Sequence, residues 1–280
     1  MTSEPGPRPS IVSLIRDRVL DAELAGLLWL LLESRVPLVV VARGSPADAV
    51  LGALLVLVPP DARVATLAGA DEDFAWLPEA AELGWTSERS PSRPSRPRDP
   101  ASRPERTVIL ARDLGGATPG PQARLAIRAL SVGYGMAATV EGDRLEDLFE
   151  RLGGPEVGAT DDELSRLGVV VALGEDGGDA NVRVTAAHYL RPVARDEHGH
   201  VQRLPPAVLA AIESRTGRLE HFAWGVVAEL ATRVGRTPKH LEREQARRAG
   251  DLEALLRAGV VEPSAVASAI ASSRTAARPA

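Results

Sequence analysis

The chain has 280 residues, of which 44% are hydrophobic and 25% charged, proportions typical of a folded globular protein. It contains no cysteine, which excludes disulfide frameworks, thiolate metal sites and cysteine nucleophiles. A formal net charge of −5 and an aromatic content of 3% disfavour a dedicated nucleic-acid binder, which needs a basic surface and stacking side chains.

The first part of the chain alternates between helical and strand patterns. Apolar residues at helical spacing over 11–34 predict one or two helices, with Asp21 as an N-cap. The continuous apolar run 36–42 predicts a strand buried on both faces, and a turn and a helix over 48–57 follow it. A second strand is expected at 63–68. This order of strand, helix and strand predicts a parallel α/β sheet.

Residues 87–105 interrupt this pattern with serine, proline and arginine, and they predict a flexible insert. The alternative role for this insert is an arginine-rich contact site for an acidic partner. After it, strands are expected at 106–111, 136–140 and 168–173, with helices near 122–132 and 145–152.

The last third of the chain predicts a different structure. Residues 181–204 alternate polar and apolar side chains around 196–200, which predicts an antiparallel hairpin. From Pro205 onward the pattern is mostly helical. The predicted organisation is a tail at 1–9, an α/β domain over 10–204, a helical subdomain over 205–274 and a tail at 275–280.

Five segments occur in the order and spacing of a known family. They are Glu23–Glu33, residues 39–61 ending in Pro-Pro-Asp, residues 103–116, residues 138–152 and residues 247–270. In these segments the chain resembles the motor ATPases of type II and type IV secretion, type IV pili and archaella, with most similarity to the archaeal and tight-adherence branch. The resemblance implies a RecA-like P-loop NTPase core with a C-terminal helical subdomain.

The resemblance places a phosphate loop after the first strand, at positions that have lost its chemistry. Such a loop uses glycine N–H groups, a lysine for the phosphates and a serine or threonine for Mg²⁺. Gly44 and Ser45 fit, whereas Pro46 removes one N–H donor. Ala47 stands at the lysine position and Asp48 at the Mg²⁺-ligand position, where an anion repels phosphate but suits a helix N-terminus. The degenerate loop comprises Arg43, Gly44, Ser45, Pro46, Ala47 and Asp48.

The other catalytic positions of the family also hold unsuitable residues. Ala68 aligns with an acidic position after the second strand, although Glu72 is nearby. Arg112 aligns with the Walker B glutamate, and Asp113 is its neighbour. Glu141 aligns with the family's histidine. Together these changes predict that hydrolysis is lost and that no cofactor or metal ion is required.

Two alternatives keep a ligand. In the first, Arg43 or Arg112 grips a phosphate, and Asp113 or Glu72 positions Mg²⁺, so that ATP with Mg²⁺ is bound. In the second, the histidines of the predicted hairpin hold a metal ion, although a solvent-exposed loop is the simpler interpretation. These histidines are His188, His198 and His200.

The leading hypothesis is a catalytically degenerate paralogue of the secretion and pilus motor ATPases that acts as a scaffold or regulatory subunit of a type IV filament or secretion machine. The expected partners are secretion or pilus proteins, including an active paralogous ATPase, in a homo- or hetero-oligomer. The alternatives are an unconventional active ATPase that powers secretion or pilus assembly, and a free-standing protein-binding module. The absence of a signal-peptide core and of a long apolar run predicts a cytoplasmic protein without a membrane span, peripheral to the membrane through its partners.

Overall fold

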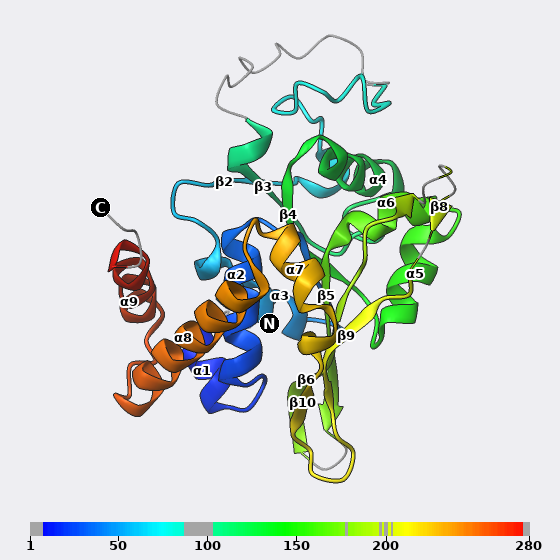
Figure 1. Ribbon diagram of the computed structural model, residues 1–280. Helices are drawn as coiled ribbons and strands as arrows, with labels where there is room; N and C mark the ends of the chain where they lie inside the picture. Colours follow the sequence, from blue (N-terminus) through cyan, green and yellow to red (C-terminus); the bar gives the residue numbers. More distant parts are fainter. Residues whose placement is uncertain are drawn as a thin grey trace, which may run out of the picture.

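An eight-stranded β-sheet organises the chain, with helices on both of its faces (Figure 1). The computed structural model describes residues 8–86, 103–176, 179–195, 198, 201–202 and 204–276. The strands of the sheet are β1 (Leu38–Val41), β2 (Arg63–Thr66), β3 (Thr107–Ala111), β4 (Gly135–Val140), β5 (Val169–Asp176), β6 (Asp179–Tyr189), β9 (Ala207–Ile212) and β10 (Leu219–His221). A separate two-stranded pair is formed by β7 (Ala194–Arg195) and β8 (Val201–Gln202).

The larger part of the sheet is parallel. Five strands follow the order β5-β1-β4-β3-β2 with parallel pairing throughout. Beyond β5, the antiparallel strands β6, β9 and β10 extend the sheet in that order. The predicted α/β class with a mainly parallel sheet is therefore confirmed.

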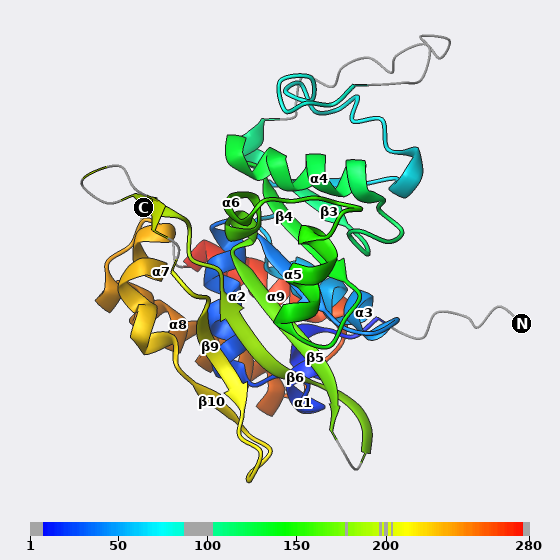
Figure 2. The ribbon, with the colours of Figure 1, turned by 90° about the vertical axis from the view of Figure 1, so that its right-hand side faces the viewer.

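The helices form a layer on each side of the sheet. One layer contains α1 (Ile11–Arg16), α2 (Ala22–Glu33), α3 (Pro46–Leu54), α8 (Pro238–Arg257) and α9 (Pro263–Ala276), with α7 (Val227–Arg233) beside α8. The other contains α4 (Gly120–Ala129), α5 (Leu145–Gly153) and α6 (Asp161–Leu164), which lie in front of the sheet in Figure 2. Short 3₁₀ turns are η1 (Leu55–Leu57), η2 (Gly69–Asp71), η3 (Pro104–Arg106), η4 (Leu130–Val132), η5 (Ser165–Leu167) and η6 (Ala223–Val226).

Each layer packs its own hydrophobic core against the sheet. On β1, Leu38 and Val40 face the α2 layer, whereas Val39 and Val41 face the α4 layer. This alternation follows from the two-residue period of a strand, and it explains why a strand between two helical layers is apolar at every position. The predicted burial of β1 on both faces is confirmed.

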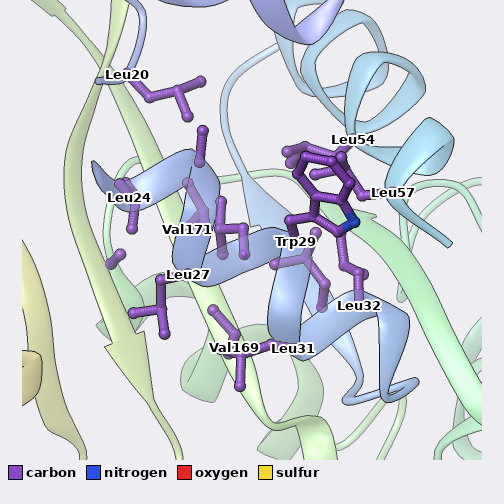
Figure 3. Close-up of a cluster of buried hydrophobic side chains, with 14 of the residues drawn as sticks. Leu20, Leu24, Leu27, Trp29, Leu31, Leu32, Leu54, Leu57, Val169 and Val171 are labelled. Atoms are coloured by element: carbon purple, nitrogen blue, oxygen red, sulfur yellow. The ribbon is translucent and has the colours of Figure 1, made fainter. Parts of the chain in front are cut away.

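Helix α2 lies at the centre of the first core. Asp21 caps it by accepting a hydrogen bond from the Leu24 N–H, as predicted. Figure 3 shows Trp29 against Leu54 and Leu57, and Leu31 beside Val169. Because α2 is covered on several sides, nearly all of its residues are buried, unlike those of an amphipathic surface helix.

A buried arginine fastens the C-terminal helices to α2, which lies beside α8 in Figure 1. Arg248 is only 3% exposed and pairs with Glu33 and with Glu244, whose Oε2 is 3.5 Å away. Its guanidinium carbon lies 5.3 Å from the centre of the Trp29 ring. Arg274 of α9 approaches the same ring at 6.0 Å and places Nε 3.4 Å from Glu33 Oε1. One carboxylate thus joins three helices.

The structure corrects two predictions for the last third of the chain. The antiparallel hairpin expected at 181–204 is limited to the two-residue strands β7 and β8, because β6 pairs with β5 and β9 instead. The prediction of mainly helical structure from Pro205 is wrong for 207–221, where β9 and β10 join the main sheet. Helical structure follows from 223.

The predicted flexible insert lies mostly outside the described residues, which resume at 103, and η3 takes its last two positions. The predicted tails fall largely outside them as well, although α9 continues to Ala276. Among the helices of the described ranges, none is both long and apolar enough to cross a membrane.

Candidate functional site

Three loops meet where the parallel strands β1, β3 and β4 end. In parallel α/β sheets, ligands bind outside the carboxyl ends of the strands. Here the Ala42 N–H donates to the Val140 carbonyl at 3.1 Å, and the Gly142 N–H donates to the Ala42 carbonyl at 3.4 Å. The Asp113 N–H donates to the Thr139 hydroxyl at 2.8 Å. We call the residues that these loops bring together the carboxyl-edge site: Arg43, Gly44, Asp48, Arg112, Asp113, Glu141 and Asp143.

A carboxylate of the chain itself occupies the loop after β1. Gly44 has φ +68°, a left-handed conformation that glycine adopts without strain. Its N–H donates to Glu141 Oε2 at 3.1 Å. Backbone N–H groups in such a loop are the donors that phosphate oxygens use. Glu141 therefore places an anion on one of the groups that a phosphate would need.

The start of α3 carries a second anion and lacks a cation. Pro46 is the first residue of this helix, and Ala47 is buried in the core beneath it. Asp48 lies in the first turn, where a carboxylate interacts favourably with the helix dipole. Asp48 therefore lies where its carboxylate can stabilise the N-terminus of α3, as the sequence predicted.

Arginines pair with these acidic side chains across the loops. Arg43 Nε lies 2.8 Å from Asp143 Oδ1, and this hydrogen bond raises the pKa of Arg43 above its ordinary value. Arg112 Nε lies 3.8 Å from Asp48 Oδ1. Both arginines are largely exposed, so each pair contributes little to stability. The pairs nevertheless engage the two cations that the alternative prediction assigned to phosphate.

Asp113 forms the turn after β3. Its φ of +44° is unusual for a residue other than glycine. Its Oδ2 accepts the Ala117 N–H at 2.9 Å, and its Oδ1 lies 3.4 Å from an Arg151 guanidinium nitrogen. A Cβ on Gly116 would lie 2.0 Å from Asp113 Oδ2, so a larger residue there would displace this carboxylate. Through these contacts Asp113 holds the backbone of its own turn and pairs with α5.

Glu72 likewise forms its hydrogen bonds within the loop after β2. It is 6% exposed and accepts hydrogen bonds from the Ala68 N–H at 2.8 Å, the Phe74 N–H at 2.9 Å and Trp76 Nε1 at 3.1 Å. Three donors satisfy the buried carboxylate, as burial of a charge requires. Neither Glu72 nor Ala68 lies in the loops that form the carboxyl-edge site.

Sequence reasoning missed two acidic residues near the start of α5, Asp143 in the loop before the helix and Asp147 in its first turn. Asp147 lies on α5 between Glu146 and Glu150, both of which are exposed. Asp147 accepts the N–H groups of Asp143 at 2.6 Å and Arg144 at 3.1 Å, which hold its pKa below the ordinary value. The signal was an acidic residue at the third position of a helix, where it caps the N-terminus.

The histidine alternative gains no support in the described ranges. Across them, no three histidine, aspartate or glutamate side chains converge as metal ligands. Burial lowers the pKa of His188 on β6. His198 is described, and His200 lies outside the described residues.

A cavity among the described residues lies away from these loops. It measures about 750 Å³ and runs beside α4, between Trp85, Arg124 and Val157. None of the residues of the carboxyl-edge site lines it. The carboxyl-edge site consists of loops that are held together by hydrogen bonds and ion pairs.

Comparison with known proteins assigns no family to this arrangement. The chain matches no protein-family model, and a search of curated proteins returns no relative.

Proposed function

We propose that the chain is a catalytically inactive protein of the RecA-like P-loop NTPase class, related to the secretion and pilus motor ATPases, and that it acts as a scaffold or regulatory subunit beside an active paralogue. The order β5-β1-β4-β3-β2 supports the class, because it brings the loops after β1 and β3 to one edge with β4 between them. These loops hold the positions that the sequence resemblance assigned to the phosphate loop and Walker B.

The hydrogen bond from Gly44 to Glu141 carries the proposal of inactivity. A nucleotide phosphate would have to displace this carboxylate and then approach Asp48, a second anion. Two like charges about 4 Å apart repel by roughly 4 kcal/mol at an effective dielectric constant of 20. The two carboxylates therefore disfavour a phosphate at the start of α3.

Turnover would need groups that the site lacks. Phosphoryl transfer requires a cation on the phosphates, Mg²⁺ and a positioned water. Ala47 is buried and supplies no charge, and Asp113 is held in its turn. Arg112 carries the wrong charge to orient a water as a glutamate does. The proposed role is consequently binding of protein partners in the cytoplasm, next to a membrane-bound secretion or pilus machine.

Calorimetry of ATP binding, combined with a phosphate-release assay, tests this function. The unmodified protein is expected to show no ATPase activity above background and no measurable ATP binding, with or without Mg²⁺. The double variant Glu141→Ala/Asp48→Thr should bind ATP measurably, because it removes both anions, but it should not turn over. Glu146→Ala removes an exposed charge on α5 and serves as the matched control.

Two outcomes would contradict the proposal. ATP turnover by the unmodified chain would show that the site is an unconventional ATPase. Unchanged ATP affinity in the double variant, with its fold intact by circular dichroism, would show that these two carboxylates do not block the site.

A further inference from the structure

A histidine fastens the edge strand β10 to the N-terminus of α2. His221 Nε2 lies 2.8 Å from Asp21 Oδ2 and 3.8 Å from Glu23 Oε2. The other oxygen of the same aspartate, Oδ1, accepts the Leu24 N–H at 2.9 Å and caps α2. One carboxylate therefore joins the start of a helix to a strand 200 residues away in the sequence.

The charged groups that face His221 are acidic. Asp21 and Glu23 approach it from α2. On β9, the residue opposite His221 is Ala210, which is uncharged. From α8, the Gln245 amide reaches the same corner and donates to the Glu23 carbonyl at 3.5 Å. A protonated imidazole thus meets two carboxylates here, which favours its charged form.

Apart from the His221 contacts, β10 is held in the sheet by a short ladder with β9. Its three residues pair with β9 from Leu219 opposite Ile212 to His221 opposite Ala210. The ladder ends where the Phe222 N–H donates to the Leu209 carbonyl at 2.8 Å. The chain then enters η6, where Trp224 is 75% exposed. An edge strand this short gains a large share of its stability from contacts outside its ladder.

We propose that His221 is a pH-sensitive latch that holds β10 and the following turn against α2 while its imidazole is protonated, and loosens them when the imidazole loses its proton. This inference uses none of the residues of the carboxyl-edge site and is independent of the function proposed above.

The direction of the pH dependence follows from the contacts. The hydrogen bond to Asp21 raises the pKa of His221, although partial burial opposes this effect. Partial burial also acts to raise the pKa of Asp21, but the hydrogen bonds from His221 and the Leu24 N–H outweigh it and leave that pKa lowered. A histidine whose pKa is raised in the folded state stabilises that state fully below its ordinary pKa of about 6.5. This stabilisation is lost as the pH rises through the raised pKa.

Hydrogen exchange between about pH 5.5 and pH 9, corrected for the intrinsic exchange rate, tests the latch at residues 207–226. Protection of these amides should fall with rising pH between two plateaus. The ratio of the plateaus should equal the ratio of the His221 acid constants in the open and latched states. The latched value is measured by NMR of the imidazole ring. This equality is the quantitative signature of a single titrating group.

Variants separate the latch from a merely structural histidine. His221→Gln keeps a neutral donor and should give a pH-independent profile at the level that the wild type reaches at high pH. His240→Gln, at an exposed position of α8, should keep the wild-type profile. Asp21→Asn preserves a good helix cap while removing the charge, so it should shift the midpoint toward the ordinary histidine pKa.

The proposal fails if His221→Gln retains the wild-type pH dependence. It also fails if the NMR midpoint of His221 is unchanged in Asp21→Asn, a test that stays valid should the glutamine variant fold poorly.

Discussion

Replacement of Glu33 by alanine is expected to lower the free energy of unfolding by about 3–5 kcal/mol, the usual cost of leaving one partner of a buried ion pair uncompensated. Glu33 pairs with both Arg248 and Arg274. Burial lowers the pKa of Arg248 to about 10, but that pKa still keeps the guanidinium charged at neutral pH. Without Glu33, Arg248 would keep only the longer contact to Glu244 and the face of Trp29.

Urea denaturation followed by circular dichroism measures this effect. Glu253→Ala removes an exposed carboxylate from α8 and should change stability by less than about 0.5 kcal/mol. The double variant Glu33→Met/Arg248→Leu should be more stable than Glu33→Ala, because an apolar pair avoids the uncompensated charge. A loss below about 1 kcal/mol in Glu33→Ala would mean that water reaches Arg248 and that the helices are not fastened by this pair.

Two glycines in helices are expected to respond to alanine in opposite directions. A Cβ on Gly26 of α2 would lie 2.8 Å from the Gln245 carbonyl oxygen and 2.9 Å from the Ala249 nitrogen. Both are backbone atoms of α8, so the helices would have to separate, at a cost of about 1–3 kcal/mol. Gly52 of α3 has nothing within 4 Å of its Cβ position, so Gly52→Ala should stabilise the protein by about 0.5–1 kcal/mol.

Thermal unfolding of Gly26→Ala, Gly52→Ala and the wild type measures these changes in stability. The two variants are directly comparable, because both substitutions add the same single methyl group. Equal stabilisation by both would show that α2 and α8 do not approach each other closely at Gly26. Destabilisation by Gly52→Ala would show that α3 is not helical at that position.

The local sequence pattern was sufficient to predict an element where that element depends on neighbouring residues alone. The uninterrupted apolar runs at β1 and β5 and the cap at Asp21 were predicted because each depends on neighbouring residues. The strand β9 was missed because its sequence, AVLAAI, is short and alanine-rich and has no clear period. Its pairing with β6 decides its conformation, and pairing between distant segments is not visible in the local sequence.

At the candidate site, too, the contacts between distant segments could not be predicted from the local sequence. Gly44 and Glu141 were both singled out, but their hydrogen bond spans 97 residues and required the strand order to be known. Likewise, the alternative prediction offered Asp113 or Glu72 to Mg²⁺ by residue type, whereas in the structure these carboxylates accept backbone N–H groups nearby and contact the side chains of Arg151 and Trp76, respectively. The residue type was informative about charge but could not reveal whether that charge was already engaged.

The fastening of the first helices by the last ones has a consequence for biosynthesis. Glu33 and Arg248 are separated by 215 residues. At about 5–20 residues per second, a ribosome needs roughly 10–40 s to add them, and α2 lacks part of its cover throughout that interval. An apolar helix exposed for this time attracts chaperones or other nascent chains. Shortening the chain before α8 would make that exposure permanent, so aggregation during synthesis is the expected fate of such truncations.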